Sequence, residues 1–285
     1  MRIAVLDNRA SLVVAGGFID IAEASSGQFG PSINNVLASG EVFAAWVRTL
    51  DAPVPTVEER EVLQSDERLN CVSPTPRQVF AIGLNYREHA HEMGLANPTQ
   101  PMVFTKFHSS LAGQHAQIPM VSDHTDWEAE MVVVIGQGGR SISVDDALGR
   151  VAGFAVGQDI SDRHLQLLGS PAQFSLGKSW QNFGPVGPWV TTLDELTNPN
   201  DLAITCDISG ERMQDSRTSD MVFTVAEVVS YLSNVVELFP GDLIFTGSPH
   251  GVGQGLTPPR FLKPGDTIAT TIEGLGTLFN EVVAP

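Results

Sequence analysis

Basic residues are scarce in this 285-residue sequence: 16 lysines and arginines stand against 33 aspartates and glutamates, and the formal net charge is −17. Nucleic acids and anionic membranes bind basic protein surface, so we expect neither as a partner. The two cysteines, Cys71 and Cys206, form no spaced pattern, which indicates a reducing compartment. No apolar run approaches the roughly 18 residues that span a bilayer. The first residues also lack the apolar core of a signal peptide, so we expect a cytoplasmic protein.

The length allows one large domain with a small appendage. Residues 1–70 predict a small N-terminal α/β module in which nothing points to chemistry, and residues 71–285 predict the main domain. In the module we expect strands at Arg2–Leu6 and Ser11–Ala15, a helix over Val36–Leu50 and a solvated charged segment over Glu58–Asp66. In the main domain we expect strands at Gln78–Gly83, Met102–Lys106, Val151–Val156 and Ala203–Ile208, and a helix over Val225–Leu238.

The acidic stretch Asp126–Glu130 runs directly into Met131–Ile135, a short apolar run that predicts a buried strand. Side chains alternate along a strand, so Glu128 and Glu130 would share a face, roughly 7 Å apart at about 3.3 Å per residue. Two adjacent carboxylates need a proton, a lysine or arginine, or a hard cation such as Mg²⁺. The alternative is an exposed acidic strand end. If the two repel each other, removing Glu128 should leave folding intact.

Other side chains could complete a site around these glutamates. Asp159 follows the predicted strand at Val151–Val156, where a third carboxylate could join them. Arg163 and Gln166 would share one face of a short helix, and a guanidinium and an amide suit a substrate carboxylate. Lys178 stands alone in an apolar, glycine-rich stretch, and a buried lysine often meets an anion.

A short helix is predicted between Asn85, as its cap, and Gly94. On it His89 and Glu92 are three residues apart and share a face. A carboxylate beside an imidazole fixes its tautomer and raises its basicity, which suits a general base. The alternative is an ordinary pair on a surface helix.

From about residue 77 onward the sequence resembles the fumarylacetoacetate hydrolase superfamily, and residues 1–70 resemble the small N-terminal module of its shorter bacterial members. The resemblance depends on seven short blocks in the same order as in the family. They are Gly83–Tyr86 with His89 and Glu92, Asp126–Glu130, Asp159–Ser161 with Arg163 and Gln166, Lys178–Ser179, Thr218–Asp220, Thr246–Gly253, and Leu262–Asp266 with Glu273–Leu278.

The resemblance implies an α+β, mostly β fold with a mixed β-roll catalytic domain, a small N-terminal module and a homodimer. It implies Mg²⁺ or Mn²⁺ held by three carboxylates, with a small 2-oxo acid as substrate. By position, the metal ligands would be Glu128, Glu130 and Asp159, the catalytic residues His89, Glu92 and Lys178, and the substrate-binding residues Tyr86, Arg163, Gln166 and Thr246.

The activity that the resemblance implies is hydrolysis of a C–C bond in an acylpyruvate, such as a fumarylpyruvate-like or acetylpyruvate-like 2,4-dioxo acid. In that reaction the metal stabilises a pyruvate enolate while His89 and Glu92 activate water. The alternatives are an oxaloacetate decarboxylase, a 2-oxo-diene-dioate isomerase or decarboxylase on the same metal site, and a non-catalytic ligand-binding member. Gln181, Asn182 and His164 depart from the family pattern, and we expect the first two to alter the pocket wall beside Lys178.

Overall fold

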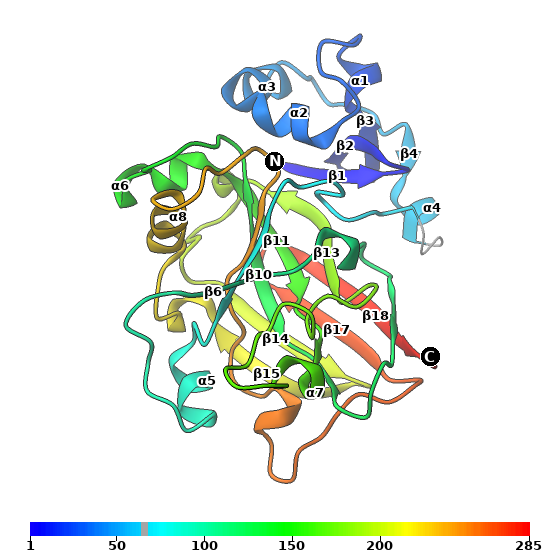
Figure 1. Ribbon diagram of the computed structural model, residues 1–285. Helices are drawn as coiled ribbons and strands as arrows, with labels where there is room; N and C mark the ends of the chain where they lie inside the picture. The colour runs from blue at the N-terminus through cyan, green and yellow to red at the C-terminus, as the bar shows by residue number, and fades with distance from the viewer. Residues whose placement is uncertain (64–67) are drawn as a thin grey trace.

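A mixed β-sheet runs the length of the molecule (Figure 1), for which a computed structural model describes residues 1–63 and 68–285. The described part of this sheet has 11 strands. In spatial order they are β4 (Val57–Glu58), β3 (Gly17–Asp20), β2 (Arg9–Val14), β1 (Arg2–Leu6), β13 (Gly184–Thr191), β11 (Val151–Gln158), β10 (Ala129–Ile135), β16 (Leu243–Phe245), β5 (Val79–Gly83) and β6 (Met102–Thr105), with β7 (Leu111–Ala112) beside β13.

A second sheet packs against β10, β11 and β13 of the first, so the expected mostly β, α+β fold is confirmed. Its strands are β15 (Glu211–Arg217), β14 (Ala203–Ile208), β17 (Thr267–Ile272), β18 (Gly276–Val283) and β8 (Gln117–Pro119). A separate pair, β9 (Thr125–Asp126) and β12 (Ser161–Asp162), lies beside the carboxylate-bearing end of β10. The strands expected around residues 78–83, 102–106, 151–156 and 203–208 are all present.

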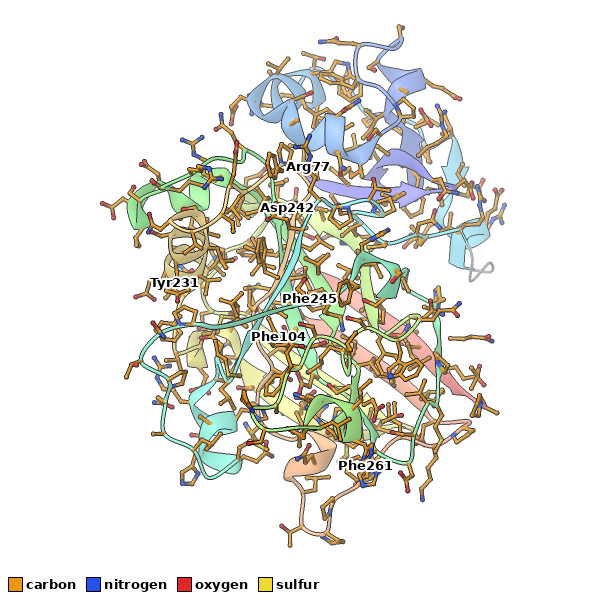
Figure 2. The ribbon with its side chains drawn as sticks, viewed as in Figure 1. Arg77, Phe104, Tyr231, Asp242, Phe245 and Phe261 are labelled. Atoms are coloured by element: carbon orange, nitrogen blue, oxygen red, sulfur yellow. The ribbon has the colours of Figure 1, made fainter. Side chains whose placement is uncertain are left out.

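Strand β10 is buried on both faces, which explains its continuous apolar sequence. Met131 and Val133 belong to the core that the second sheet completes. Val132 and Val134 point the other way, into a core shared with the N-terminal strands and helices. Phe245, at the end of β16, joins that same core and lies near the centre of the molecule (Figure 2). The alternation follows from the two-residue period of a strand.

The N-terminal segment extends the main sheet, because β1 pairs antiparallel with β13. Its helices are α1 (Ile21–Ala24), α2 (Ile33–Ala38), α3 (Gly40–Val47) and α4 (Glu59–Leu63). The single helix predicted over Val36–Leu50 is wrong: the chain breaks into α2 and α3 at Gly40, whose φ of +45° ordinary residues adopt rarely. The boundary predicted near residue 70 stays a prediction.

The charged segment Glu58–Asp66 is solvated over residues 58–61, as expected, where it forms the end of β4 and the start of α4, while Val62 is buried. Its residues 64–66 lie outside the described part. The helix predicted over Val225–Leu238 ends early: α8 spans Val225–Ser233. Leu238 pairs with Gly139 in a β-bridge, which draws the chain out of the helix.

The remaining helices are short: α5 (Arg87–Glu92), α6 (Val144–Ala147), α7 (Arg163–Gln166), and the 3₁₀ turns η1 (His108–Ser110), η2 (Leu148–Arg150), η3 (Leu193–Glu195), η4 (Thr218–Asp220) and η5 (Gly253–Gly255). In the described parts of the chain, no helix is long and apolar enough to cross a membrane.

Candidate active site

Three buried carboxylates meet where β10 begins and β11 ends. Pairing of these strands places Glu130 opposite Gly157, and the Asp159 N–H donates to the Glu128 carbonyl at 2.9 Å. Glu128, Glu130 and Asp159 each offer an oxygen within 4.8 Å of the others. The alternative of an exposed acidic strand end is therefore wrong, because the glutamates are only 7% and 1% exposed.

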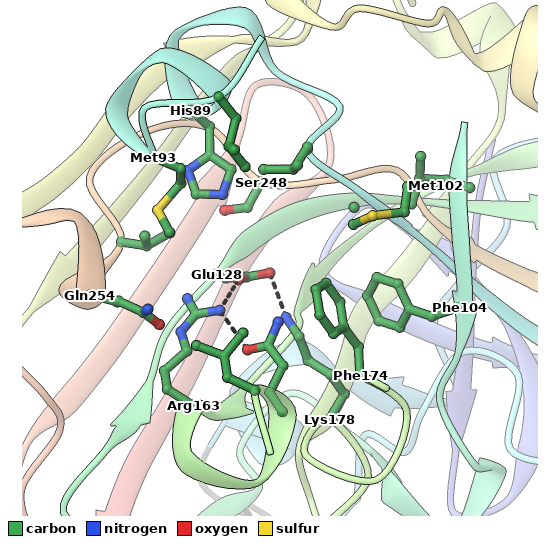
Figure 3. A pocket seen from close by; sticks show the side chains of 17 residues that line it. His89, Met93, Met102, Phe104, Glu128, Arg163, Phe174, Lys178, Ser248 and Gln254 are labelled. Carbon is green, nitrogen blue, oxygen red and sulfur yellow. Dashed lines mark hydrogen bonds and ion pairs between the residues drawn. The ribbon is translucent and has the colours of Figure 1, made fainter. Parts of the chain in front are cut away.

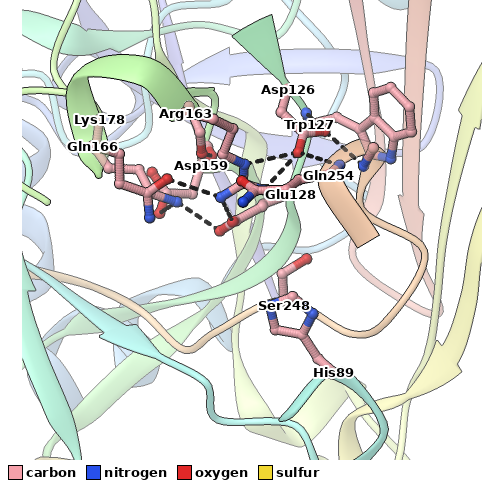
Figure 4. A network of polar contacts seen from close by, with 12 residues as sticks. His89, Asp126, Trp127, Glu128, Asp159, Arg163, Gln166, Lys178, Ser248 and Gln254 are labelled. Atoms are coloured by element: carbon pink, nitrogen blue, oxygen red, sulfur yellow. Dashed lines mark hydrogen bonds and ion pairs between the residues drawn. The ribbon is translucent and has the colours of Figure 1, made fainter. Parts of the chain in front are cut away.

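Three cations surround these carboxylates, and Figure 4 shows two of them, Arg163 and Lys178. Arg163 lies 2.6 Å from Glu128 and 2.8 Å from Asp126, the residue at the end of β9. Lys178 lies 2.8 Å from both Glu128 and Asp159. Lys106 donates to Asp159 at 2.7 Å and to the backbone carbonyl of Lys178. Each cation thus joins segments that are far apart in the sequence.

The neighbouring cations compensate Glu128 and Glu130 to different extents. Burial by itself raises the pKa of Glu128, but Lys178 and Arg163 outweigh it and lower that pKa to about 2. Burial together with Asp159 and Glu128 holds the pKa of Glu130 well above its ordinary value. Removing Glu128 would relieve its repulsion of Glu130, but it would also take a partner from two buried cations, Lys178 and Arg163. These contacts favour a net loss of stability, contrary to the expectation that folding stays intact. Glu130 is the carboxylate that lacks compensation.

The cluster fits a divalent metal ion. Its donors are carboxylate oxygens, which Mg²⁺ and Mn²⁺ prefer. Asp159 Oδ2 is buried and accepts no well-aligned hydrogen bond from the described residues, although the Lys178 ammonium lies 2.8 Å away. One oxygen of Glu130 accepts from the Gly247 N–H at 2.8 Å, and no cationic side chain is within ion-pair distance of this glutamate in the described residues. A cation at this position would lower the cost of burying the three charges together.

Asp126 and Lys106 are structural members of the site that the sequence reasoning missed. Asp126 is fully buried and accepts from the backbone N–H groups of Gly253 (2.7 Å) and Gln254 (3.0 Å) while it holds Arg163. It therefore anchors the glycine-rich loop to the cluster. For Lys106 the signal was available: it too is a single lysine beside an apolar stretch, the feature that identified Lys178.

His89 lies on α5 across the cavity from the cluster (Figure 4), and Glu92 belongs to the same helix. His89 Nδ1 is 2.9 Å from one oxygen of Glu92, whose other oxygen accepts from the Gly251 N–H at 2.9 Å. The predicted side-chain pair is thus present and is tied to the glycine-rich loop. The prediction that Asn85 caps this helix is wrong, because Tyr86 is at the cap position. The Asn85 side chain instead hydrogen-bonds the backbone of Thr246 and Phe223.

The predicted substrate residues differ in position. Arg163 and Gln166 line a cavity of about 150 Å³ together with His89, Glu128 and Lys178. Thr246 and Tyr86 are fully buried and are not among its described lining residues. The Thr246 hydroxyl donates to the Met131 carbonyl at 2.7 Å, and the Tyr86 hydroxyl has no hydrogen-bond partner among the described residues. Their roles toward a substrate stay predictions.

The three departures from the family pattern are not among the described residues that line the cavity, so the expectation that Gln181 and Asn182 alter the wall beside Lys178 stays a prediction. Gln181 and His164 are exposed. Asn182 adopts a left-handed backbone (φ +61°) and donates to the Gln117 carbonyl at 2.8 Å. These residues therefore shape the surface and a turn beyond the site.

Comparison with known proteins bears on this arrangement. The family model for the C-terminal domain of fumarylacetoacetate (FAA) hydrolase matches residues 78–283. The chain belongs to the fumarylacetoacetate hydrolase family. The matched residues run from β5 to β18 and include every residue of the site described above.

Relatives in the family differ in their reactions. The chain is 38% identical over 273 residues to the mitochondrial oxaloacetate tautomerase FAHD2B of Bos taurus, covering 94% of this chain and 84% of that protein. It is 45% identical over 208 residues to a 2,4-didehydro-3-deoxy-L-rhamnonate hydrolase of Sphingomonas, covering 72% and 73%. Fumarylpyruvate hydrolase of Pseudomonas aeruginosa, solved with Mn²⁺ and pyruvate, is 33% identical with a TM-score of 0.67, over 74% of this chain and 91% of that one.

Proposed function

We propose that this protein is a metal-dependent hydrolase that cleaves the C–C bond of an acylpyruvate. The observation that carries the proposal is the His89–Glu92 pair facing the Glu128–Lys178 cluster across one small cavity. One side can activate water while the other binds the 2-oxo acid end of the substrate.

Glu128, Glu130 and Asp159 would hold Mg²⁺ or Mn²⁺, which when bound supplies a Lewis acid that polarises the 2-oxo group. The Mn²⁺ and pyruvate in the P. aeruginosa relative support this assignment. Arg163 fixes Gln166 at the cavity wall through a 3.0 Å hydrogen bond, and the amide of Gln166 is placed to donate to the substrate's carboxylate.

His89 acts as the general base. Its Nδ1 donates to Glu92, and Nε2 takes a proton from water. The water oxygen bonds to the distal carbonyl carbon, and the bond from that carbon to the pyruvate unit breaks. The electron pair stays on the pyruvate unit, which becomes pyruvate by gaining a proton. The buried ammonium of Lys178 stabilises the developing negative charge, and the other product is a carboxylic acid.

A second candidate is tautomerisation or decarboxylation of oxaloacetate, supported by the 38% identity to an oxaloacetate tautomerase. Both reactions use the 2-oxo acid end of the site, and neither needs an attacking water. The charged end of the cavity would therefore suit either reaction. The two candidate reactions differ in the group that the 2-oxo acid carries, so the substrate that the protein accepts distinguishes them.

The test is a panel of acylpyruvates and oxaloacetate, assayed with Mg²⁺ and with Mn²⁺. We expect release of pyruvate and of the matching carboxylic acid from an acylpyruvate. Conversion of oxaloacetate with no cleavage of any acylpyruvate would replace the hydrolase with the second candidate. A homodimer is part of the same proposal, and light scattering that reports a monomer at micromolar concentration would overturn that part.

A further inference from the structure

The cavity is divided into a charged end and an apolar side. Glu128, Arg163 and Lys178 form the charged end, and Met102, Phe104 and Phe174 lie together on the side away from Arg163 (Figure 3). In the proposed function the 2-oxo acid occupies the charged end. The acyl group of the substrate therefore lies against the remaining walls of the cavity, and the apolar side indicates what kind of acyl group fits.

The apolar side is built by two segments. Met102 and Phe104 are alternate residues of β6 and so present the same face. Phe174 comes from the loop before Lys178, and its ring packs edge to face on Phe104 with centroids 5.7 Å apart. The Lys178 ammonium lies 5.5 Å from the Phe104 ring centroid, so the apolar side begins where the charged end stops.

Gly83 leaves room for this arrangement. A β-carbon at Gly83 would lie 2.2 Å from the terminal methyl group of Met102, so a larger residue would displace the methionine. The absence of a side chain at residue 83 therefore lets Met102 cover the end of β5 and form part of the wall.

A second carboxylate on the substrate would find no partner on this side. Among the described residues that line the cavity, Arg163 is the only arginine and Lys178 the only lysine. Both are paired with carboxylates of the cluster. The neutral polar side chains Ser248 and Gln254 lie on the opposite wall (Figure 3). A charged group placed against apolar side chains without a partner carries a large desolvation cost.

We propose that the acyl group of the substrate is neutral, short and apolar, and that it contacts Met102, Phe104 and Phe174. The inference rests on the proposed function only in taking the 2-oxo acid to lie at the charged end. It disfavours the dicarboxylic substrates, fumarylpyruvate and oxaloacetate, against acylpyruvates with an alkyl acyl group. A cavity of about 150 Å³ suits a short group, since a cavity of that size holds a benzene-sized ligand.

Binding of two unreactive 2-oxo acids of matched shape tests this without requiring turnover. In 5-methyl-2-oxohexanoate an isopropyl group replaces the second carboxylate of 2-oxoglutarate. Titration calorimetry with Mn²⁺-loaded protein at 0.15 M salt should show tighter binding of the neutral-tailed acid, on the order of 100-fold. Equal or tighter binding of 2-oxoglutarate would overturn the inference.

Phe174→Arg adds a cation to the apolar side, and Leu176→Arg is the matched control, because Leu176 belongs to the same loop but is 60% exposed and does not line the cavity. We expect the first variant to reduce the preference for the neutral-tailed acid at least roughly tenfold, whereas the second leaves it unchanged. An equal change in both variants would assign the preference to net charge and overturn the local explanation.

The two proposals fail in different ways. Tight binding of the neutral-tailed acid without cleavage of any acylpyruvate would overturn the hydrolase but support the apolar acyl site. Cleavage of fumarylpyruvate at least as efficiently as an alkyl acylpyruvate would support the hydrolase and overturn the apolar acyl site. If neither 2-oxo acid binds, both proposals are wrong.

Discussion

The two halves of the segment 128–135 are both buried, yet they depend on different kinds of neighbour. Val133 and its apolar neighbours pack into cores to which many segments contribute, and any apolar surface of the right shape satisfies them. Glu128 contacts two particular cations, whereas Glu130 has no cationic side chain within ion-pair distance among the described residues. Apolar burial thus fixes the strand, whereas the charged half depends on individual partners and a ligand.

The largest contrast is expected between Glu128→Gln and Glu130→Gln. Each removes one proposed metal ligand, so both should lose divalent metal binding in calorimetry and lose activity. In EDTA, Glu128→Gln should lower the free energy of unfolding by about 3–5 kcal/mol, because it leaves Arg163 and Lys178 partly unpaired. Glu130→Gln should leave it unchanged or raise it, because Glu130 is uncompensated in the metal-free protein.

Urea unfolding of both variants in EDTA measures this difference. Equal destabilisation would contradict the distribution of charge described here. Full activity of the wild type in excess EDTA would sink the metal assignment itself.

His89→Ala tests the side of the cavity opposite the cluster. General-base catalysis contributes about 10²–10⁴-fold, so kcat for an acylpyruvate should fall by roughly that factor while metal affinity is unchanged. Turnover of oxaloacetate should fall less, because it needs no attacking water. His91→Ala is the matched control, since His91 is exposed on the same helix. A similar loss of activity in both variants would argue against a specific role for His89.

Val133→Ala probes the apolar half of β10. Loss of two buried methyl groups should lower the free energy of unfolding by about 2 kcal/mol, with no change in metal affinity measured by calorimetry. A weakened metal affinity would show that the apolar and charged halves of the strand are coupled.

The smallest effect is expected from Cys71, which lies in the core that Val132 and Val134 share with the N-terminal segment. Burial raises the pKa of its thiol from an ordinary 9.0 to about 12. The raised pKa in the folded state contributes its full stabilisation of the folded protein below about pH 9. This contribution falls as the pH rises toward 12, because the thiol of the unfolded chain ionises first. Between pH 7 and 9.5 the wild type should lose about 0.8 kcal/mol more than Cys71→Ala in urea unfolding. Identical pH dependence would mean that the folded protein also ionises this thiol.

Local sequence patterns predicted β5, β6, β10, β11 and β14 of the main domain, because the alternation or apolar run of each is contained within a few residues. Two errors in this domain occurred where distant contacts decide. The helix expected to reach Leu238 ends at Ser233 since Leu238 pairs with Gly139, and Asn85 serves Thr246 and Phe223 in place of a helix end. Neither partner is visible from the local sequence.

By itself the sequence determined the family, the three acidic positions and the His89–Glu92 spacing, because these depend on residue identity and on the periods of strands and helices. Only the tertiary structure decided that Lys106 and Asp126 belong to the site, that Glu128 is compensated and Glu130 is not, and that one side of the cavity is apolar. The physical reason is that charge compensation and desolvation act between atoms a few ångströms apart, and folding brings those atoms together from segments as far apart as Lys106 and Lys178.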